Sequence, residues 1–517
     1  MPASHLLAFD LGTGGNKAAL YAPDGTCLAE VFAPYPTFYP HPGWHEQRPT
    51  DWWQALLDST RLLLAQTAIL PAEIAACAIS GHSLGAVPVD GQGRLLRAAT
   101  PIWSDSRPTA QAAAFFEKVD PAAWYAQTGN GFPAPLYTLF KTLWYRDCEP
   151  ELFAQTRSIL GTKDYLNLLL TGVTATDPSY ASGSGVYDLR AGGYSPALIQ
   201  ASGLPETLFP PIQPSSAVIG GLTAAAAEAL GLPRGLPVVA GGVDNSCMAL
   251  GARSLGEGDV YNSQGSSSWI AVTSARPLLD ERARPFVFAH VIPGLFTSAV
   301  GIFSTGTSLR WIRDQLCPDL LEQARVQGRD VYDLMTALAA SSPPGARGLL
   351  FHPNMAGGSS LDPGPQLRGA FLNLDLGHTR ADLLRAALEG IAFQGRLALD
   401  VLRGLAPLSN EMIVVGGGSR SPLWRQIHAD AYGLTLLKTS IDQQAAALGA
   451  AALAAVGLGL WPNFEPIERL HQVESTCAPN PPTAAFYASL LPVFRQASID
   501  LTRLGSNLAD LSTPTRP

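Results

Sequence analysis

The chain has 517 residues, which is enough for two to four domains at roughly 100–200 residues per domain. Apolar residues make up 47% and charged residues 15%, a composition that supplies sizeable cores and excludes a disordered chain. The formal net charge of −8, without any concentrated run of Lys and Arg, argues against binding to the phosphate backbone of a nucleic acid.

The opening of the chain predicts several strands joined by tight turns. The expected elements are strands at 6–9, 17–21 and 27–32, a helix at 52–64 and a strand at 74–80. The first turn contains Gly12, Gly14 and Gly15, and Asp24-Gly25 between apolar runs is a hairpin signal. The order strand, strand, strand, helix, strand excludes a simple alternating strand–helix barrel.

A similar opening recurs near the middle of the chain. Residues 259–272 repeat the pattern of an apolar strand, a Gly/Ser turn and a second apolar strand. Gly12 and Gly265 are separated by 253 positions, close to half the chain. This spacing suggests two halves of related architecture, 1–250 and 251–517, although polar hairpins are also common in unrelated proteins.

Three glycine-rich turns, which begin at Gly12, Gly265 and Gly416, each follow an apolar strand. Glycine allows backbone N–H groups to approach a phosphate closely. The sequence contains no Gly-Lys pair, so a P-loop is excluded, and the turn at Gly416 lacks the spacing of a dinucleotide fingerprint. A single such turn is compatible with a structural role, but three of them with carboxylates at two strand ends favour a nucleotide site.

Asp10 and Asp244 are these two carboxylates. Asp10 would repel a phosphate at the first glycine turn unless a divalent cation stood between them, so we interpret it as a residue that positions Mg²⁺. The alternative is a side chain that caps the turn. Asp244 ends a predicted strand and is placed to accept a proton from a substrate hydroxyl, or to act as the N-cap of the helix that follows.

Gly81 to Gly85 match G-x-S-x-G, the nucleophile elbow of the α/β-hydrolases, with Ser83 in the nucleophile position. That motif requires a helix immediately after the serine. Residues 86–96 instead predict a strand, a turn and a second strand, so a serine hydrolase is disfavoured.

With these residues identified, the sequence resembles the FGGY carbohydrate kinases, and among them the xylulokinase branch, over roughly residues 5–460. The ordered set of motifs is specific, although most single pieces are not. The segments that carry the resemblance are 9–13 with Lys17, 79–81, 102–107, 138–144, 240–245, 414–424 with Gln426, and 447–451.

Members of this family have two actin-like (ribonuclease-H-like) α/β domains, with ATP and sugar meeting in the cleft between them. The resemblance implies that the N-terminal half binds the sugar and the C-terminal half ATP, that Asp10 helps to hold Mg²⁺, and that Asp244 is the catalytic base. The implied sugar-binding residues are His82, Ser83, Leu84, Trp103, Asp105, Asp244 and Asn245. The implied nucleotide-binding residues are Gly12, Thr13, Lys17, Gly265, Ser266, Gly306, Gly417, Gly418 and Ser421.

Two positions depart from the family pattern. Xylulokinases usually have Gln-Met-His where this chain has His82-Ser83-Leu84, in a segment that contacts the sugar, which puts the particular sugar in doubt. Gly14 replaces the usual Ser or Thr of the first phosphate loop, which would loosen one phosphate contact without changing the expected class of protein.

The sequence therefore predicts an ATP-dependent kinase that phosphorylates a ketopentose such as D-xylulose. Other acceptors stay open: another ketose such as ribulose, a polyol such as erythritol or glycerol, or an aldonate such as gluconate. A nucleotide-switched assembly protein related to actin or to the heat-shock chaperones would share the glycine turns, but would not need Asp244 beside a sugar pocket with Trp103. A silent sugar sensor would bind sugar without forming product.

The expected location is the cytoplasm. The cysteines are far apart, which predicts free thiols rather than a disulfide framework or a zinc site. Residues 1–10 lack the basic region of a signal peptide, and the apolar run 445–461 is short for a membrane span and typical of a packed internal helix. We expect a small-molecule sugar as partner, with no membrane or nucleic acid; a homodimer is one open possibility for the oligomeric state.

Overall fold

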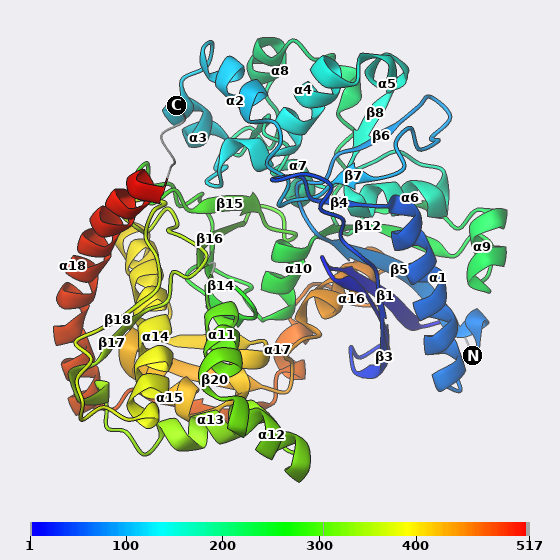
Figure 1. Cartoon of the computed structure of the whole chain (residues 1–517). Coiled ribbons are helices and arrows are strands. Elements are labelled where there is room, and N and C mark those ends of the chain that lie inside the picture. Colours follow the sequence, from blue (N-terminus) through cyan, green and yellow to red (C-terminus); the bar gives the residue numbers. More distant parts are fainter. Residues whose placement is uncertain (1–2, 303, 513–517) are drawn as a thin grey trace. The chain divides into compact units, whose positions relative to one another are not determined.

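The computed structural model describes residues 3–302 and 304–512 as a mixed α/β structure (Figure 1). The chain divides into two compact units, which confirms the expected α/β fold class with two domains. The first unit is made of Met1–Glu257, Thr273–Ser298 and Gln444–His471, and the second of Gly258–Val272, Ala299–Gln443 and Gln472–Pro517. The assignment of sugar binding to 1–250 and of nucleotide binding to 251–517 stays a prediction.

The first unit contains a mixed sheet with the strand order β11-β12-β5-β1-β2-β3. These strands are β1 (His5–Leu11), β2 (Gly15–Tyr21), β3 (Cys27–Pro34), β5 (Ile74–Gly81), β11 (Val218–Gly221) and β12 (Pro237–Val243). β2 pairs antiparallel with β1 and β3, whereas β5 pairs parallel with β1 and β12. The predicted order of three strands, a helix and a strand is therefore present.

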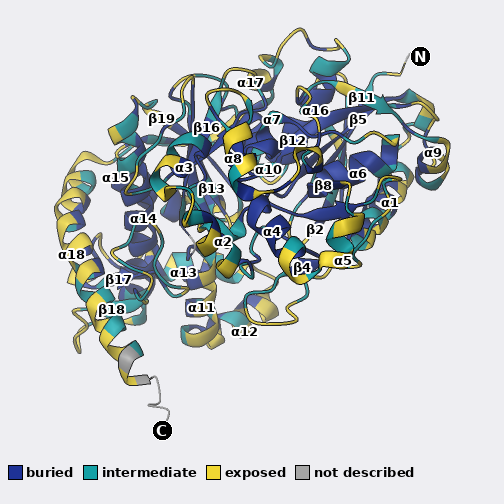
Figure 2. Cartoon of the chain, turned by 90° about the horizontal axis from the view of Figure 1, so that it is seen from above, coloured by how far each residue is buried: buried dark blue, intermediate teal, exposed yellow. Residues whose placement is uncertain are grey.

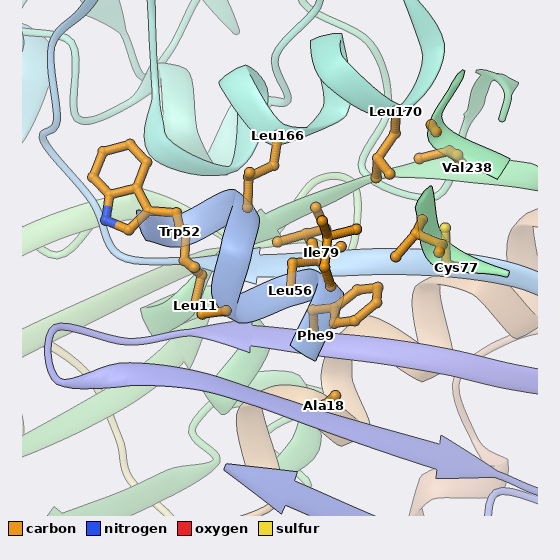
Figure 3. Packing of buried hydrophobic residues seen from close by; sticks show 14 of the residues in the cluster. Phe9, Leu11, Ala18, Trp52, Leu56, Cys77, Ile79, Leu166, Leu170 and Val238 are labelled. Atoms are coloured by element: carbon orange, nitrogen blue, oxygen red, sulfur yellow. The ribbon is translucent and has the colours of Figure 1, made fainter. Parts of the chain in front are cut away.

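Helices cover both faces of this sheet. On one face lie α1 (Pro49–Gln66) and α6 (Thr162–Thr171), and Figure 3 shows Leu56 of α1 close to Phe9 of the sheet. Proline in the first turn of α1 lacks the N–H that would have no helical partner there, and Asp51 suits the positive end of the helix dipole. These apolar contacts hold one face of the sheet against the two helices.

On the other face lie α10 (Asp244–Gly251) and α16 (Ala445–Gly457), which pack against each other and against the sheet. Alanine dominates α16 and nearly all of it is buried, so the expectation of a packed internal helix at 445–461 is confirmed (Figure 2). A Cβ on Gly449 would overlap the Cys247 carbonyl of α10, so glycine is required for the close approach of the two helices. A helix from late in the sequence thus completes the N-terminal unit.

The second unit repeats the same arrangement of strands. The second sheet has the strand order β15-β16-β14-β13-β19-β20-β21, which matches the order of the first sheet apart from the additional edge strand β15. Its strands are β13 (Val260–Gln264), β14 (Ser268–Ser274), β15 (Phe286–Ala289), β16 (Phe296–Ile302), β19 (Glu411–Val415), β20 (Thr435–Thr439) and β21 (Val473–Cys477). The first strand, β13, is antiparallel to the second and parallel to β19, as β1 is to β2 and β5. The mid-chain repetition in the sequence therefore corresponds to two sheets of the same topology.

Helices around the second sheet include α11 (Gly306–Leu316), α13 (Val331–Ala339), α14 (Arg380–Leu405), α15 (Pro422–Tyr432) and α18 (Pro481–Ser512). The Glu389 carboxylate of α14 accepts hydrogen bonds from Arg385 Nε and Tyr487 Oη, both 2.6 Å long, and so joins α14 to α18. Asn262 Nδ2 donates to Tyr432 Oη at 3.0 Å, which ties the first strand of this sheet to α15.

The remaining helices and strands lie around these two sheets. In the first unit they are β4 (Glu46–Gln47), β6 (Val87–Val89), β7 (Thr100–Pro101), α2 (Thr109–Phe116), α3 (Pro121–Thr128), α4 (Thr138–Cys148), α5 (Pro150–Gln155), β8 (Ser158–Leu160), α7 (Pro178–Ala181), β9 (Tyr187–Asp188), β10 (Gly193–Tyr194), α8 (Pro196–Ser202), α9 (Ala224–Leu230) and α17 (Pro466–Leu470). In the second unit they are α12 (Pro318–Gln327), β17 (Leu350–His352) and β18 (Ala370–Leu372). No helix in the described ranges is long and apolar enough to cross a membrane.

Candidate active site

Asp10 and Asp244 lie at one edge of the first sheet. β1, β5 and β12 are parallel neighbours, and the carboxyl ends of parallel strands meet at a common edge. Ser80 of β5 stands between the other two strands, opposite both Asp10 and Gly242. Its hydroxyl donates to Asp10 Oδ1 at 3.1 Å. The structure therefore brings together the two carboxylates that the sequence separates by more than two hundred positions.

These two carboxylates influence each other electrostatically. Burial raises the pKa of Asp10, while the Lys17 ammonium and the Ser80 hydroxyl act to lower it. Burial, followed by the negative charge of Asp10, raises the pKa of Asp244 to about 7. A carboxylate with a pKa near neutrality can accept a proton at physiological pH and release it again. This pair is also the part of the unit where a divalent cation would relieve the repulsion between two negative charges.

The first glycine turn, between β1 and β2, is braced from three sides. Tyr35 Oη donates to the Gly12 carbonyl, and Gln47 Nε2 donates to the Thr13 carbonyl at 2.7 Å. Trp103 Nε1 donates to Thr13 Oγ1 at 2.9 Å. Tyr35 and Gln47 were missed in the sequence because nothing local distinguishes them. Their effect is to fix the turn that carries the predicted phosphate-binding residues, while Lys17 lies opposite Asp10 on β2.

His82 begins the segment that departs from the xylulokinase pattern. Its ring is 1% exposed, packs edge-on against Trp52 and has no hydrogen-bond partner on either nitrogen among the described residues. Burial lowers the pKa of His82 to about 3, and the Lys141 ammonium adds to this effect. The imidazole is therefore neutral at physiological pH and offers both a donor and an acceptor nitrogen.

The next residues of this segment are held by a buried lysine. Leu84 has φ = 60° and its side chain is packed in an apolar cluster with Tyr137 and Phe140. Lys141 Nζ donates to the carbonyls of Leu84 at 2.8 Å, Ile102 at 2.7 Å and Leu136 at 2.7 Å. The three N–H groups of one ammonium thus join three loops, and they stabilise a backbone conformation that leucine rarely adopts.

Asp105 is completely buried in an ion cluster. Arg107 Nη2 donates to Asp105 Oδ2 at 2.6 Å and to Glu46 Oε1 at 2.7 Å, and the His45 backbone N–H donates to the same Asp105 oxygen. The Arg107 guanidinium also lies over the Trp44 ring at 3.8 Å. The sugar contact expected for Asp105 stays a prediction; the observed bonds anchor the loop that carries Trp103.

Asn245 lies beside Asp244 in the first turn of α10 and donates its backbone N–H to Asp244 Oδ1 at 2.8 Å.

The second unit contains a cavity of about 370 Å³ at the corresponding edge of its own sheet. Six of the nine residues implied in nucleotide binding line it: Gly265, Ser266, Gly306, Gly417, Gly418 and Ser421. The other lining residues include Arg310, Tyr332 and Trp424, which the sequence did not single out. Three motifs from distant parts of the chain therefore converge on one cavity.

Glycine is needed where these turns touch. A Cβ on Gly306 would overlap the Gly265 carbonyl, which accepts the Gly306 N–H at 3.2 Å. Gly416 has φ = 92°, and a Cβ there would lie 2.6 Å from the Gln264 carbonyl. Gly417, in contrast, has open space around it on the cavity side. Arg310 Nη2 donates to Ser266 Oγ at 3.2 Å, so a cation stands beside the second predicted phosphate turn.

Two other interpretations were tested by the structure. Ser83 is followed by a bend and by strand β6, not by a helix, so the nucleophile elbow is absent. Over residues 3–302 and 304–512, no group of three or more His, Cys, Asp or Glu side chains is arranged to hold a metal ion. A magnesium ion that is bound through one or two carboxylates and substrate phosphates does not need such a group.

Comparisons with known proteins agree with this geometry. Residues 5–251 match the N-terminal domain of the FGGY family of carbohydrate kinases, and residues 260–458 match its C-terminal domain. The xylulose kinase of Escherichia coli is 31% identical over 95% of this chain and 98% of its own, and the autoinducer-2 kinase of Yersinia pseudotuberculosis is 29% identical over 93% and 92%. The crystal structure of xylulose kinase from Rhodospirillum rubrum, 30% identical, superposes with a TM-score of 0.88 over 97% of this chain and 100% of that one. With both of its domain models matched across most of the sequence, this chain belongs to the FGGY family of carbohydrate kinases.

Proposed function

We propose that this carbohydrate kinase transfers the γ-phosphate of ATP to a hydroxyl of a ketopentose similar to D-xylulose. The observation that carries the proposal is the Asp10–Asp244 pair at one sheet edge, where burial and mutual repulsion bring the pKa of Asp244 to about 7. The names of the relatives support a sugar acceptor, and they differ among themselves in which sugar.

Asp244 acts as the general base in this proposal. Its carboxylate accepts the proton of the substrate hydroxyl as the oxygen attacks phosphorus, and it can do so because its raised pKa matches physiological pH. Thr13 and Lys17, at the braced first turn, hold the transferring phosphate. Magnesium, positioned through Asp10, would neutralise charge on the phosphates, and the Asp10–Asp244 repulsion provides a place for it.

The cavity of the second unit binds the nucleotide in this proposal. The turns at Gly265, Ser266 and Gly306 line the cavity without bulky side chains, which leaves room for phosphate groups, and Arg310 adds a positive charge near them. Gly417, Gly418 and Ser421 also line the cavity, and the two glycines and the small serine leave room for the adenosine. A volume of about 370 Å³ is within the range of small-molecule sites.

The choice of sugar depends on residues 82–84. The neutral His82 nitrogens have no hydrogen-bond partner among the described residues, which suits hydrogen bonding to sugar hydroxyls, whereas the Leu84 side chain is packed in an apolar cluster. We therefore expect a neutral ketose or polyol in preference to an aldonate, since this segment supplies no cation for a carboxylate. Ser83, Trp103, Asp105 and Asn245 complete the proposed sugar site.

A panel of acceptors tests the function directly. ADP release should be measured with D-xylulose, ribulose, erythritol, glycerol and gluconate, with Mg²⁺ present and then removed by a chelator. Rapid release with one ketopentose, and loss of release without Mg²⁺, is the expected result. ADP release that no acceptor stimulates would instead favour a nucleotide-switched assembly protein, and sugar binding without product would favour a sensor.

We place the enzyme in the cytoplasm, where ATP is available, and propose a homodimer as its assembly.

A further inference from the structure

A buried ion cluster lies beside β12, the strand that immediately precedes Asp244. Lys163 Nζ is 2.6 Å from Asp164 Oδ1 and 2.9 Å from Asp177 Oδ1. The side chains of all three residues are almost completely buried. Burying charged groups is costly even when they are paired, so such a cluster points to a requirement for a defined geometry.

The second oxygen of Asp177 orients a serine hydroxyl. Asp177 Oδ2 accepts hydrogen bonds from Ser179 Oγ at 2.5 Å and from Ser215 Oγ at 2.8 Å. A hydroxyl has one proton, and Ser179 uses it to donate a hydrogen bond to the carboxylate. A lone pair of Ser179 Oγ is therefore directed elsewhere, and it accepts the backbone N–H of Val243 at 2.9 Å.

This hydrogen bond supports a part of β12 where the regular ladder is interrupted. The pairing of β12 with β5 shifts register between Val239 and Gly242, and Gly241 has φ = 73°. In this irregular stretch the Ala240 carbonyl accepts bonds from Lys163 Nζ at 3.2 Å and from Asn167 Nδ2 at 2.9 Å. A β-bulge redirects the strand that follows it, so the direction of Asp244 depends on what holds the bulge.

We propose that Ser179, oriented by Asp177 and Lys163, is a positioning residue that holds Val243 and thereby aims the Asp244 carboxylate at the substrate hydroxyl. The proposal rests on the proposed function, since Asp244 is its base. Ser179 lies 65 positions before Asp244 and contacts no reacting atom; it acts through the backbone N–H adjacent to the base.

Ser179→Ala tests the proposal, with Ser215→Ala as the matched control. Both variants remove one hydrogen bond from the same oxygen of Asp177, but only Ser179→Ala removes the acceptor of the Val243 N–H. We expect Ser179→Ala to lower kcat at least tenfold with the KM for ATP within twofold of wild type. Ser215→Ala should keep kcat within threefold, with a similar change in Tm. Equal kcat values for the two variants at equal loss of Tm would overturn the proposal.

A double-variant cycle with Asp244→Asn distinguishes positioning of the base from general loosening. If Ser179 acts through Asp244, adding Ser179→Ala to Asp244→Asn should change the residual single-turnover rate less than twofold. An additional tenfold loss in that background would show that Ser179 acts elsewhere and would reject the proposal. Failure of the proposed function is separate: wild-type protein would then show no sugar-stimulated ADP release, or Asp244→Asn would retain turnover.

Discussion

Each unit has a candidate site at one edge of its sheet, and the two sheets share a strand order. The residues that form the two sites differ. In the first unit, buried polar side chains such as Gln47, Lys141 and Ser179 hold the backbone of the first glycine turn, of segment 82–84 and of β12. The second unit uses glycine turns that leave a cavity. A buried carboxylate needs partners that fix its position and pKa, whereas a nucleotide brings its own charge and needs room and N–H groups. Changes at the first edge should therefore alter the chemical step, and changes at the second should alter nucleotide affinity.

Asp244→Asn should give the largest effect and is confined to the first edge. We expect kcat to fall at least about 10³-fold, because a general base contributes roughly 10²–10⁴-fold, while the KM or Kd for ATP stays within threefold. The matched control is Asp24→Asn in the exposed hairpin between β2 and β3. Near-normal turnover of Asp244→Asn would remove Asp244 from the role of base.

The same substitution makes a prediction about stability. The native pKa of Asp244 is raised above its ordinary value, so the native state favours the protonated form and loses stability as the pH rises from about 4 to 7. Asn carries no charge, so Asp244→Asn should be more stable than wild type at pH 8, by on the order of 4 kcal/mol, and about equal at pH 4. Thermal unfolding at both pH values measures this difference; an Asp244→Asn protein that is less stable at pH 8 would contradict it.

Gly306→Ala should disrupt the nucleotide cavity of the second unit, with a smaller effect on the kinetics than Asp244→Asn. A Cβ at this position overlaps the Gly265 carbonyl, so the two turns must separate, and we expect the KM for ATP to rise at least tenfold with the sugar affinity unchanged. Gly404→Ala, in α14 with open space around its Cβ, is the control. Isothermal titration with ATP and with sugar separately would measure both affinities. A selective loss of sugar binding in Gly306→Ala would reverse the proposed division between the units.

The pH dependence of kcat/KM for the sugar should be about as large as the effect of Gly306→Ala. Asp244 must be unprotonated to accept a proton, and a pKa of about 7 leaves most of it protonated at pH 6. The kcat/KM for the sugar should thus be about tenfold lower at pH 6 than at pH 8. The nucleotide cavity contains no such group among the residues proposed to bind ATP, so ATP affinity measured without sugar should change little over this range. A flat profile of kcat/KM from pH 6 to 8 would contradict the assigned pKa.

Trp103→Phe should give the smallest effect and would show how tightly the first edge is braced. It removes the indole N–H that donates to Thr13 Oγ1 but keeps an aromatic ring. We expect kcat/KM to fall two- to fivefold, which corresponds to about 0.5–1 kcal/mol and lies within the usual contribution of one hydrogen bond. Trp311→Phe, at a 44% exposed position of the second unit, should have no effect. A hundredfold loss for Trp103→Phe would show that the indole N–H contributes far more than its one hydrogen bond to Thr13.

The sequence by itself determined the features that depend on neighbours in the chain. Strand, turn and strand at both openings follow from short apolar runs and from the glycines between them, so the turns at Gly12, Gly265 and Gly416 were all predicted. Asp10 and Asp244 were identified because they stand where predicted strands end. The family resemblance then connected these local patterns to a carbohydrate kinase.

Only the tertiary structure decided how the distant parts combine. Tyr35, Gln47, Lys141 and Ser179 make ordinary local patterns, and their roles come from contacts with residues tens of positions away. The return of α16 to the first unit, after the second unit has formed its sheet, also has no local signal. The pKa of Asp244 depends on burial and on Asp10, which only the fold brings near it. Local propensity specifies turns and strands; burial and charge pairing exist only after the chain has folded.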